Sequence, residues 1–121
     1  MYFTSREKGA IIYVAGLIAA ADGRLAEEEK ALTAAVCLQM GVEPSEAKLA
    51  ESMELDEALS VISAMTPEEK RFVCSFLGTM CAIDGNVDKK EGLLWSLISA
   101  RCSFPTMSIA EAGQNIKNYL L

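Results

Sequence analysis

The chain of 121 residues has the length of one domain and is long enough to bury a hydrophobic core. Apolar residues make up 51% of it, which excludes a disordered segment, and a net charge of −6 argues against a nucleic-acid binder, because phosphate neutralisation needs clustered lysine and arginine. The composition predicts a single domain over residues 1–121, compatible with a cation or a basic protein as its partner.

Start and stop signals along the chain predict about seven helices and no strand. Thr4 and Glu7 form a capping box at the start of the first helix, and Asp22-Gly23 ends it. Asp56 is expected to cap a short helix in the middle of the chain. The β-branched runs continue into alanine-rich sequence, which favours helix over strand. The expected all-α helical bundle has helices at residues 4–21, 26–40, 44–53, 56–64, 66–83, 88–101 and 108–120.

One segment of the chain is repeated. Residues 4–38 align without a gap with residues 66–100, and the matching residues include a Thr-x-x-Glu-Lys start signal, an Asp-Gly turn and an acid seven residues after the aspartate. Each copy therefore predicts a helical hairpin whose tight end carries paired acids.

The first helix of each copy carries a long stretch without charge, residues 10–21 and 72–83. A helix that is apolar on every face is expected to be buried all round. We expect these two helices to pack against each other at the centre, to cross near Gly16 and Gly78, and to run antiparallel. In that arrangement the two Asp-Gly turns would lie at opposite ends of the domain.

The acids of the two turns match part of a calcium-binding loop. Asp84, Asp88 and Glu91 fit the second half of an EF-hand loop, and Asp22 to Glu29 fits it more loosely. The first and third ligand positions of such a loop fall on apolar residues of the preceding helix, so a complete EF-hand is not expected. What is left in each copy is an aspartate at a turn and a glutamate one turn into the next helix.

An Ala-x-Asp-Gly turn followed by an acid seven residues later, present twice in an all-helical domain of this length, resembles the TerB-like family, named for tellurite-resistance proteins. The resemblance spans residues 4–119. It implies a non-enzymatic cytoplasmic module in a stress or tellurite-resistance response, or a membrane-associated scaffold, with an acidic patch for divalent cations. The family's acidic motif maps onto Asp22, Glu28 and Glu29 in the first copy and onto Asp84 and Glu91 in the second.

Carboxylates without histidine select Ca²⁺, Mg²⁺ or Mn²⁺ over zinc or copper, and weak binding is expected. The full set of expected metal ligands is Asp22, Glu28, Glu29, Asp84, Asp88 and Glu91. The second copy departs from the family's pattern, because Lys89 and Lys90 replace Glu27 and Glu28 and reduce its negative charge.

The same acids also have a structural explanation. Asp22 and Asp84 can cap the helices that follow them, and glutamates in a first helical turn are favoured by the helix dipole. The alternative hypothesis is therefore a protein–protein interaction or scaffold domain with no metal site and with a protein partner bound on its outer helices.

Catalysis has little support in the sequence. There is no histidine, no Ser-x-Gly elbow and no phosphate-binding glycine loop. A metal-dependent hydrolase built from carboxylates alone is a minor alternative. The four cysteines lie in apolar helical runs without a Cys-x-x-Cys pair, which predicts buried free thiols in a reducing compartment.

The N-terminal segment, with Arg6 and Lys8 before an apolar stretch, is similar to a secretory signal. Because the stretch is the first copy of the repeat and is too short to span a bilayer, we expect a cytoplasmic protein without a transmembrane segment. Peripheral membrane association stays open.

Overall fold

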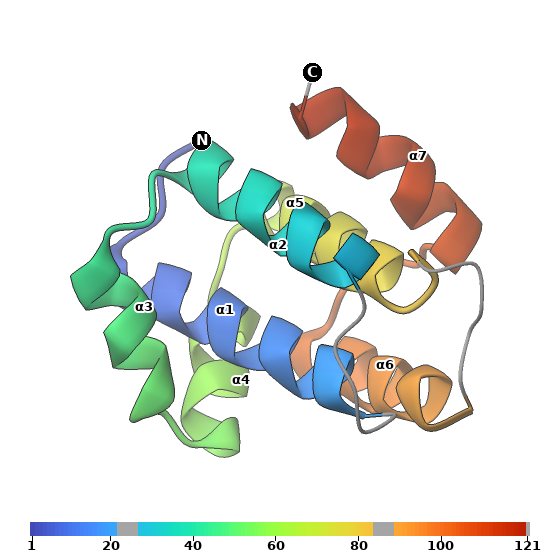
Figure 1. Ribbon diagram of the computed structural model, residues 1–121. Coiled ribbons are helices and arrows are strands. Elements are labelled where there is room, and N and C mark those ends of the chain that lie inside the picture. The colour runs from blue at the N-terminus through green and yellow to red at the C-terminus, as the bar shows by residue number, and fades with distance from the viewer. Residues whose placement is uncertain (22–26, 84–88, 121) are drawn as a thin grey trace.

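The structure, a computed structural model, describes residues 1–21, 27–83 and 89–120, apart from the side chains of Lys89 and Glu91. Within these residues the chain forms seven α-helices and no β-strand (Figure 1), which confirms the all-α prediction. The helices are α1 (Ser5–Ala20), α2 (Glu27–Met40), α3 (Pro44–Glu51), α4 (Leu55–Ser63), α5 (Pro67–Met80), α6 (Lys89–Cys102) and α7 (Ile109–Leu120).

The helix starts follow the predicted local chemistry at three places. The Thr4 hydroxyl accepts the backbone N–H of Glu7 at 3.2 Å, and Thr66 does the same for Glu69 at 3.2 Å. Ser108 caps α7 in the same way, accepting from Glu111 at 3.1 Å. These bonds satisfy amides that the first helical turn leaves free.

The predicted cap of α4 is wrong. Glu54 precedes the helix in an extended conformation and makes no capping bond with its side chain, whereas Asp56 already lies inside the first turn. There its carboxylate faces the positive end of the helix dipole, which is favourable without a cap.

Two helices form the centre of the bundle. α1 packs most extensively against α3 and α4, and it also contacts α5, while α5 packs mainly against α7. The core that they share is filled by fully buried side chains, the largest being Phe76, Ile11, Ile18, Ile62 and Leu77. The expected contact between the two charge-free helices is therefore present.

The expectation that both helices are buried all round is correct for only one of them. Every residue of α5 from Phe72 to Met80 is buried. The helix ends at Met80 rather than at residue 83, and Ala82 and Ile83, beyond its end, are half-buried. On α1, however, Gly16 and Ala20 are exposed, because α2 covers only part of the outer face. The crossing at two glycines is also wrong. A Cβ at Gly16 would meet nothing within 4 Å, and Gly78 packs instead against Ala112 of α7 and Trp95 of α6.

The relative direction of α1 and α5 follows from their contacts with α2. Near the start of α1, the Lys8 ammonium donates to the carbonyl of Gly41, just after α2, at 3.2 Å. At the other end, Ala19 and Lys30 line one shallow groove. α2 thus runs antiparallel to α1.

α2 is also antiparallel to α5. Met40 at the end of α2 shares a cavity with Phe72 near the start of α5. The Thr33 hydroxyl, in the first half of α2, lies 3.6 Å from the sulfur of Met80 at the end of α5. Two helices antiparallel to the same third helix run in the same direction, and both run from left to right in Figure 1. The antiparallel expectation is wrong.

The two copies of the repeat have different surroundings. α1 is covered by the two short helices of the middle segment, whereas α5 is covered by the C-terminal helix. The internal repeat therefore stays a prediction from the sequence.

Candidate functional site

Two of the six predicted metal ligands have described side chains. Glu28 and Glu29 lie in the first turn of α2, where the helix dipole favours acids. Glu28 is exposed, but Glu29 is only 2% exposed, so adjacent carboxylates of the motif stand in different environments. The neighbouring Glu27 forms an exposed ion pair with Lys30 at 3.2 Å.

The other predicted ligands lie outside the described part of the structure. These are Asp22, Asp84 and Asp88, together with the side chain of Glu91. Among the described side chains, no group of three or more histidine, cysteine or acidic residues is placed to hold a metal ion. The structure therefore does not bring Glu28 and Glu29 together with a third described ligand.

The ends of α1 and α5 nevertheless lie on the same side of the bundle. Near the end of α1, Ala19 lines the same groove as Lys30 of α2. At the end of α5, the Met80 sulfur lies 3.6 Å from the hydroxyl of Thr33, which is also in the first half of α2. The chain continues from these two helix ends into the two Asp-Gly motifs of the sequence. This common direction could not be read from the sequence, and it is the structural fact that bears most directly on the acidic motifs.

A second feature is an apolar groove of about 570 Å³ between α2, the end of α5 and α7. Its walls include Leu32, Ile83, Ile109, Ile116 and Leu120, and among the described residues that line it Lys117 is the one basic residue. A volume of this size is typical of ligand sites in proteins. The sequence analysis did not predict the groove. The apolar residues of α7 could have indicated it, because some of them, such as Ile109 and Leu120, line the groove in addition to those that pack on α5.

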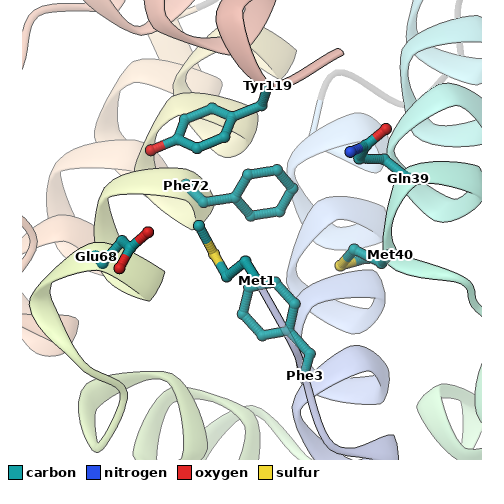
Figure 2. A pocket seen from close by; sticks show the side chains of 7 residues that line it. All are labelled: Met1, Phe3, Gln39, Met40, Glu68, Phe72 and Tyr119. Carbon is teal, nitrogen blue, oxygen red and sulfur yellow. The ribbon is translucent and has the colours of Figure 1, made fainter.

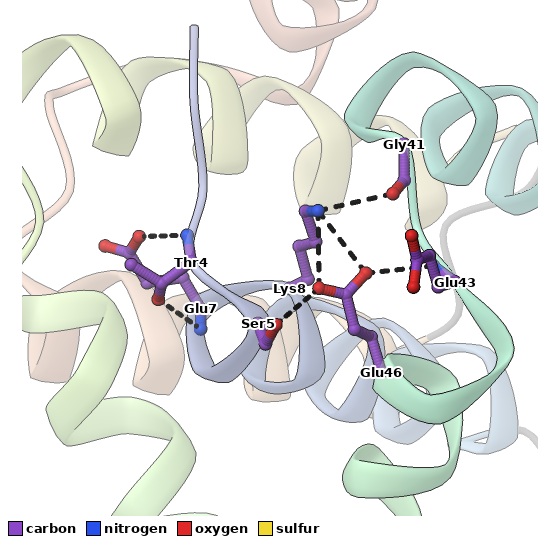
Figure 3. A network of polar contacts seen from close by, with 7 residues as sticks. All are labelled: Thr4, Ser5, Glu7, Lys8, Gly41, Glu43 and Glu46. Carbon is purple, nitrogen blue, oxygen red and sulfur yellow. Dashed lines mark hydrogen bonds and ion pairs between the residues drawn. The ribbon is translucent and has the colours of Figure 1, made fainter.

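A third feature is a buried acid that holds α3 against α1 (Figure 3). The Glu46 carboxylate accepts the Ser5 hydroxyl at 2.6 Å and the backbone N–H of Glu43 at 2.9 Å. The Lys8 ammonium lies 3.3 Å from it and also donates to Gly41. The Ser5 bond, then the Glu43 bond and then Lys8 lower the pKa of Glu46, against the opposing effect of its burial.

This network has a structural role. The carboxylate oxygens of Glu46 already interact with three donors within the protein, which leaves them little capacity to bind a ligand. This network could not be predicted from the sequence, because Lys8 and Glu46 are far apart along the chain.

The four cysteines are free thiols, as expected. Burial raises the pKa of Cys74 to about 11 and that of Cys102 to about 11. It also raises the pKa of Cys37, which is half-buried. A nucleophilic cysteine needs a lowered pKa, so these three thiols are poorly suited to attack a substrate.

None of the described helices is long and apolar enough to cross a membrane.

Comparison with known proteins gives one informative result. No protein-family model matches the chain, and no curated protein matches it either. Among solved structures, the chain is similar to the crystal structure of a protein of unknown function, PG1108, from Porphyromonas gingivalis. The TM-score is 0.83 and the sequence identity is 36%, over 98% of this chain and 92% of the other. The chain therefore belongs to the same family as PG1108 of Porphyromonas gingivalis.

Proposed function

We propose that this chain is a non-enzymatic, TerB-like helical module that binds a divalent cation through its two acidic Asp-Gly turns. The observation that carries the proposal is the common direction of α1 and α5 against α2. Because both motifs follow helix ends on one side of the bundle, acids from both copies can contribute to one ion. Opposite ends would have allowed only two separate half-sites.

The chemistry of the donors favours hard cations. Ca²⁺ takes six to eight oxygen ligands, and the two motifs together offer six carboxylates in the set Asp22, Glu28, Glu29, Asp84, Asp88 and Glu91. A net charge of −6 also attracts cations to the protein. The proposed setting, taken from the TerB-like resemblance, is a cytoplasmic stress or tellurite-resistance response.

The test is a titration of the whole chain with Ca²⁺, Mn²⁺ and Mg²⁺, followed by thermal unfolding. A ligand that binds only the native state stabilises it by about 2.7 kcal/mol at a concentration 100 times its Kd. We expect at least one of these ions to raise the Tm, and Asp22→Asn to reduce that rise. Asp56→Asn on α4 is the matched control and should leave it unchanged. No rise with any ion at millimolar concentration would contradict the proposal.

A second candidate function is favoured by the groove between α2, α5 and α7. An amphipathic partner helix can place its apolar face in such a groove, with anchors at positions i, i+3 or i+4, and i+7. The lining residues Ile109 to Leu120 extend over all of α7, about 18 Å for 12 residues, which suits three turns of a partner helix.

Selection from a displayed library of amphipathic helices would test this second function. Ala110→Arg places a bulky charge in the groove, and Ala47→Arg places one on the exposed face of α3 as a control. Peptides that carry the expected anchors and lose binding only to Ala110→Arg would support an interaction module. Peptides that bind both variants equally would count against it.

A further inference from the structure

The apolar groove between α2, the end of α5 and α7 has a buried floor. Its volume is about 570 Å³, and its lining includes Leu32 and Ile116, which are 8% and 3% exposed. Thr79 is buried there too, but its hydroxyl already donates to the carbonyl of Ser75 at 2.7 Å. A molecule in the groove therefore meets mainly aliphatic carbon at its floor and finds no free hydroxyl hydrogen on Thr79.

The two ends of the groove can be told apart, because α7 runs antiparallel to α5. Gly78 packs on Ala112 in the first half of α7. Nearer the start of α5, the ring of Phe72 packs on Tyr119 at the end of α7, with centroids 5.0 Å apart and an angle of 88° between the rings (Figure 2). Ile83, which follows the end of α5, therefore lies toward the start of α7.

The charges at the two ends of the groove differ. Near Ile83, the chain continues directly into the acidic motif that begins with Asp84. Toward the end of α7, Lys117 is the one basic residue among the described residues that line the groove, and none of these residues is acidic. Within the described part of the chain, Lys117 takes part in no ion pair. A negative charge on a ligand is therefore favoured at the Lys117 end and disfavoured at the other.

The groove is narrow for its length. Spread over the about 18 Å of α7, its volume corresponds to a mean cross-section of about 30 Å². A helix with its side chains is about 10 Å across, or about 80 Å² in section, so a partner helix could place only its anchor side chains in this space. A single alkyl chain can lie in the groove along its whole length. From Lys117 to Ile109 the groove extends about 12 Å, which suits a chain of medium length.

We propose that this groove binds a medium-chain fatty acid, with the carboxylate at Lys117 and the alkyl chain directed toward Ile83. Burial of the chain against the apolar walls supplies most of the affinity, and the ammonium of Lys117 selects the charge of the head group. Gln114 lies one turn before Lys117 on the exposed rim of α7 and can donate an amide N–H to the same carboxylate.

The inference goes beyond the proposed cation site and does not depend on it. Fatty-acid binding is measured in the presence of EDTA, so it is tested without divalent ions, and loss of cation binding in Asp22→Asn leaves every lining residue of the groove unchanged. The two proposals can therefore fail separately. The fatty acid does compete with the partner helix of the second candidate function, because both would occupy the same groove.

The dependence of affinity on chain length is the first test. Straight-chain acids from hexanoate to tetradecanoate are titrated into the full chain by calorimetry, below their micelle concentrations and at constant ionic strength. Each additional buried methylene should raise the affinity about fourfold until the groove is full, after which the affinity should level off. Affinity that keeps rising with length would show unspecific binding to apolar surface. Saturable binding of helical peptides but of no fatty acid would assign the groove to a partner helix. Either result would overturn the inference.

Decan-1-ol, a neutral ligand with the same chain as decanoate, tests the role of the carboxylate. It should bind about threefold more weakly than decanoate, which is the size expected for a partly exposed ion pair. Lys117→Met keeps the apolar stem of the side chain and should abolish the difference between the two ligands. Lys48→Met, at an exposed lysine of α3, is the charge-matched control and should preserve it. Equal affinity of the wild-type protein for both ligands would show an apolar groove without a carboxylate site and would overturn the inference.

Gly113 allows the groove to be filled without a clash. A Cβ at Gly113 would meet nothing within 4 Å, so Gly113→Leu adds its side chain to open space in the groove that this residue lines. The variant should fold, since glycine is the poorer helix former, and should bind decanoate about tenfold more weakly or not at all. Gly16→Leu on α1, where a Cβ also meets nothing within 4 Å, is the control outside this groove and should bind normally. Thermal melts confirm that both variants are folded. Unchanged decanoate binding in folded Gly113→Leu would overturn the inference.

Discussion

A Cβ atom on Gly78 would lie 2.7 Å from the Cβ of Ala112. α5 and α7 therefore approach so closely at this point that the space between them does not hold one additional methyl group. The ring of Trp95 closes a second side, 3.2 Å from the same position. This contact fixes α7 against the central helix and so sets one wall of the apolar groove.

Replacing Gly78 with alanine should destabilise the protein. Alanine favours a helix over glycine by about 1 kcal/mol, but overpacking a filled core costs roughly 1–3 kcal/mol. Neither Cβ can rotate away, so α5 and α7 have to separate. We expect a lower free energy of unfolding in urea and a more accessible α7 in hydrogen exchange.

The matched control for this variant is the equivalent glycine of the first copy. A Cβ at Gly16 meets nothing within 4 Å, so Gly16→Ala should be neutral or stabilise by up to about 1 kcal/mol. Equal effects of the two substitutions would contradict the packing described for α5 and α7.

The carboxylate of Glu46 should make stability depend on pH in the acidic range. Its pKa is lowered in the folded state, first by the Ser5 hydrogen bond, so the ionised form is preferred by the native protein. A lowered pKa contributes stability that is fully present above the ordinary value of 4.5 and is lost as pH falls through the folded pKa.

Unfolding in urea measured from neutral pH down to the acid range would show this. Glu46→Gln should be less stable than wild type at neutral pH and should show a weaker decline below the ordinary pKa. Ser5→Ala should reduce the same decline in part. If Glu46→Gln lost stability with falling pH as steeply as wild type, acids other than Glu46 would be responsible for that loss.

The thiols should differ in reactivity. Cys74 and Cys102 are completely buried, with pKa values raised to about 11, whereas Cys37 is half-buried. We expect a thiol reagent at neutral pH to modify Cys37 first and slowly, and to modify Cys74 and Cys102 only at the rate of unfolding. Mass spectrometry of the labelled peptides measures this order. Early labelling of Cys102 would mean that α6 opens before the rest of the bundle.

The stoichiometry of cation binding tests whether the two acidic turns act together. If they share one ion, Asp22→Asn and Asp84→Asn should each abolish the same single binding step in calorimetry. Two independent steps, each lost in one variant only, would show separate sites. In that case we expect the first turn to bind more tightly, because Lys89 and Lys90 reduce the negative charge of the second.

Much of the secondary structure could be predicted from the sequence. The capping boxes at Thr4 and Thr66 lie where the pattern places them, and α2 ends at Met40, before Gly41, which has a positive φ of 68°. The burial of α5 was also correct. These features depend on residues within one or two helical turns of each other, so a local stretch of sequence contains the information that determines them.

The site could be predicted less well. The acidic motifs are visible in the sequence, but the relative direction of α1 and α5 is not, and the antiparallel expectation was wrong. The groove and the Glu46 network were both missed. Each of them joins residues from helices that are distant along the chain, such as Leu32 and Ile116 in the groove and Lys8 and Glu46 in the network.

The sequence by itself determined that this protein is all-helical and where most of its described helices begin. Only the tertiary structure decided that α1 and α5 run in parallel, that α1 leaves Gly16 exposed, and that Gly78 packs on Ala112 rather than on α1. The physical reason is how far apart along the chain the interacting residues lie. Caps and turns are hydrogen bonds between near neighbours, whereas packing depends on how the shapes of side chains far apart in the sequence fit together at high density.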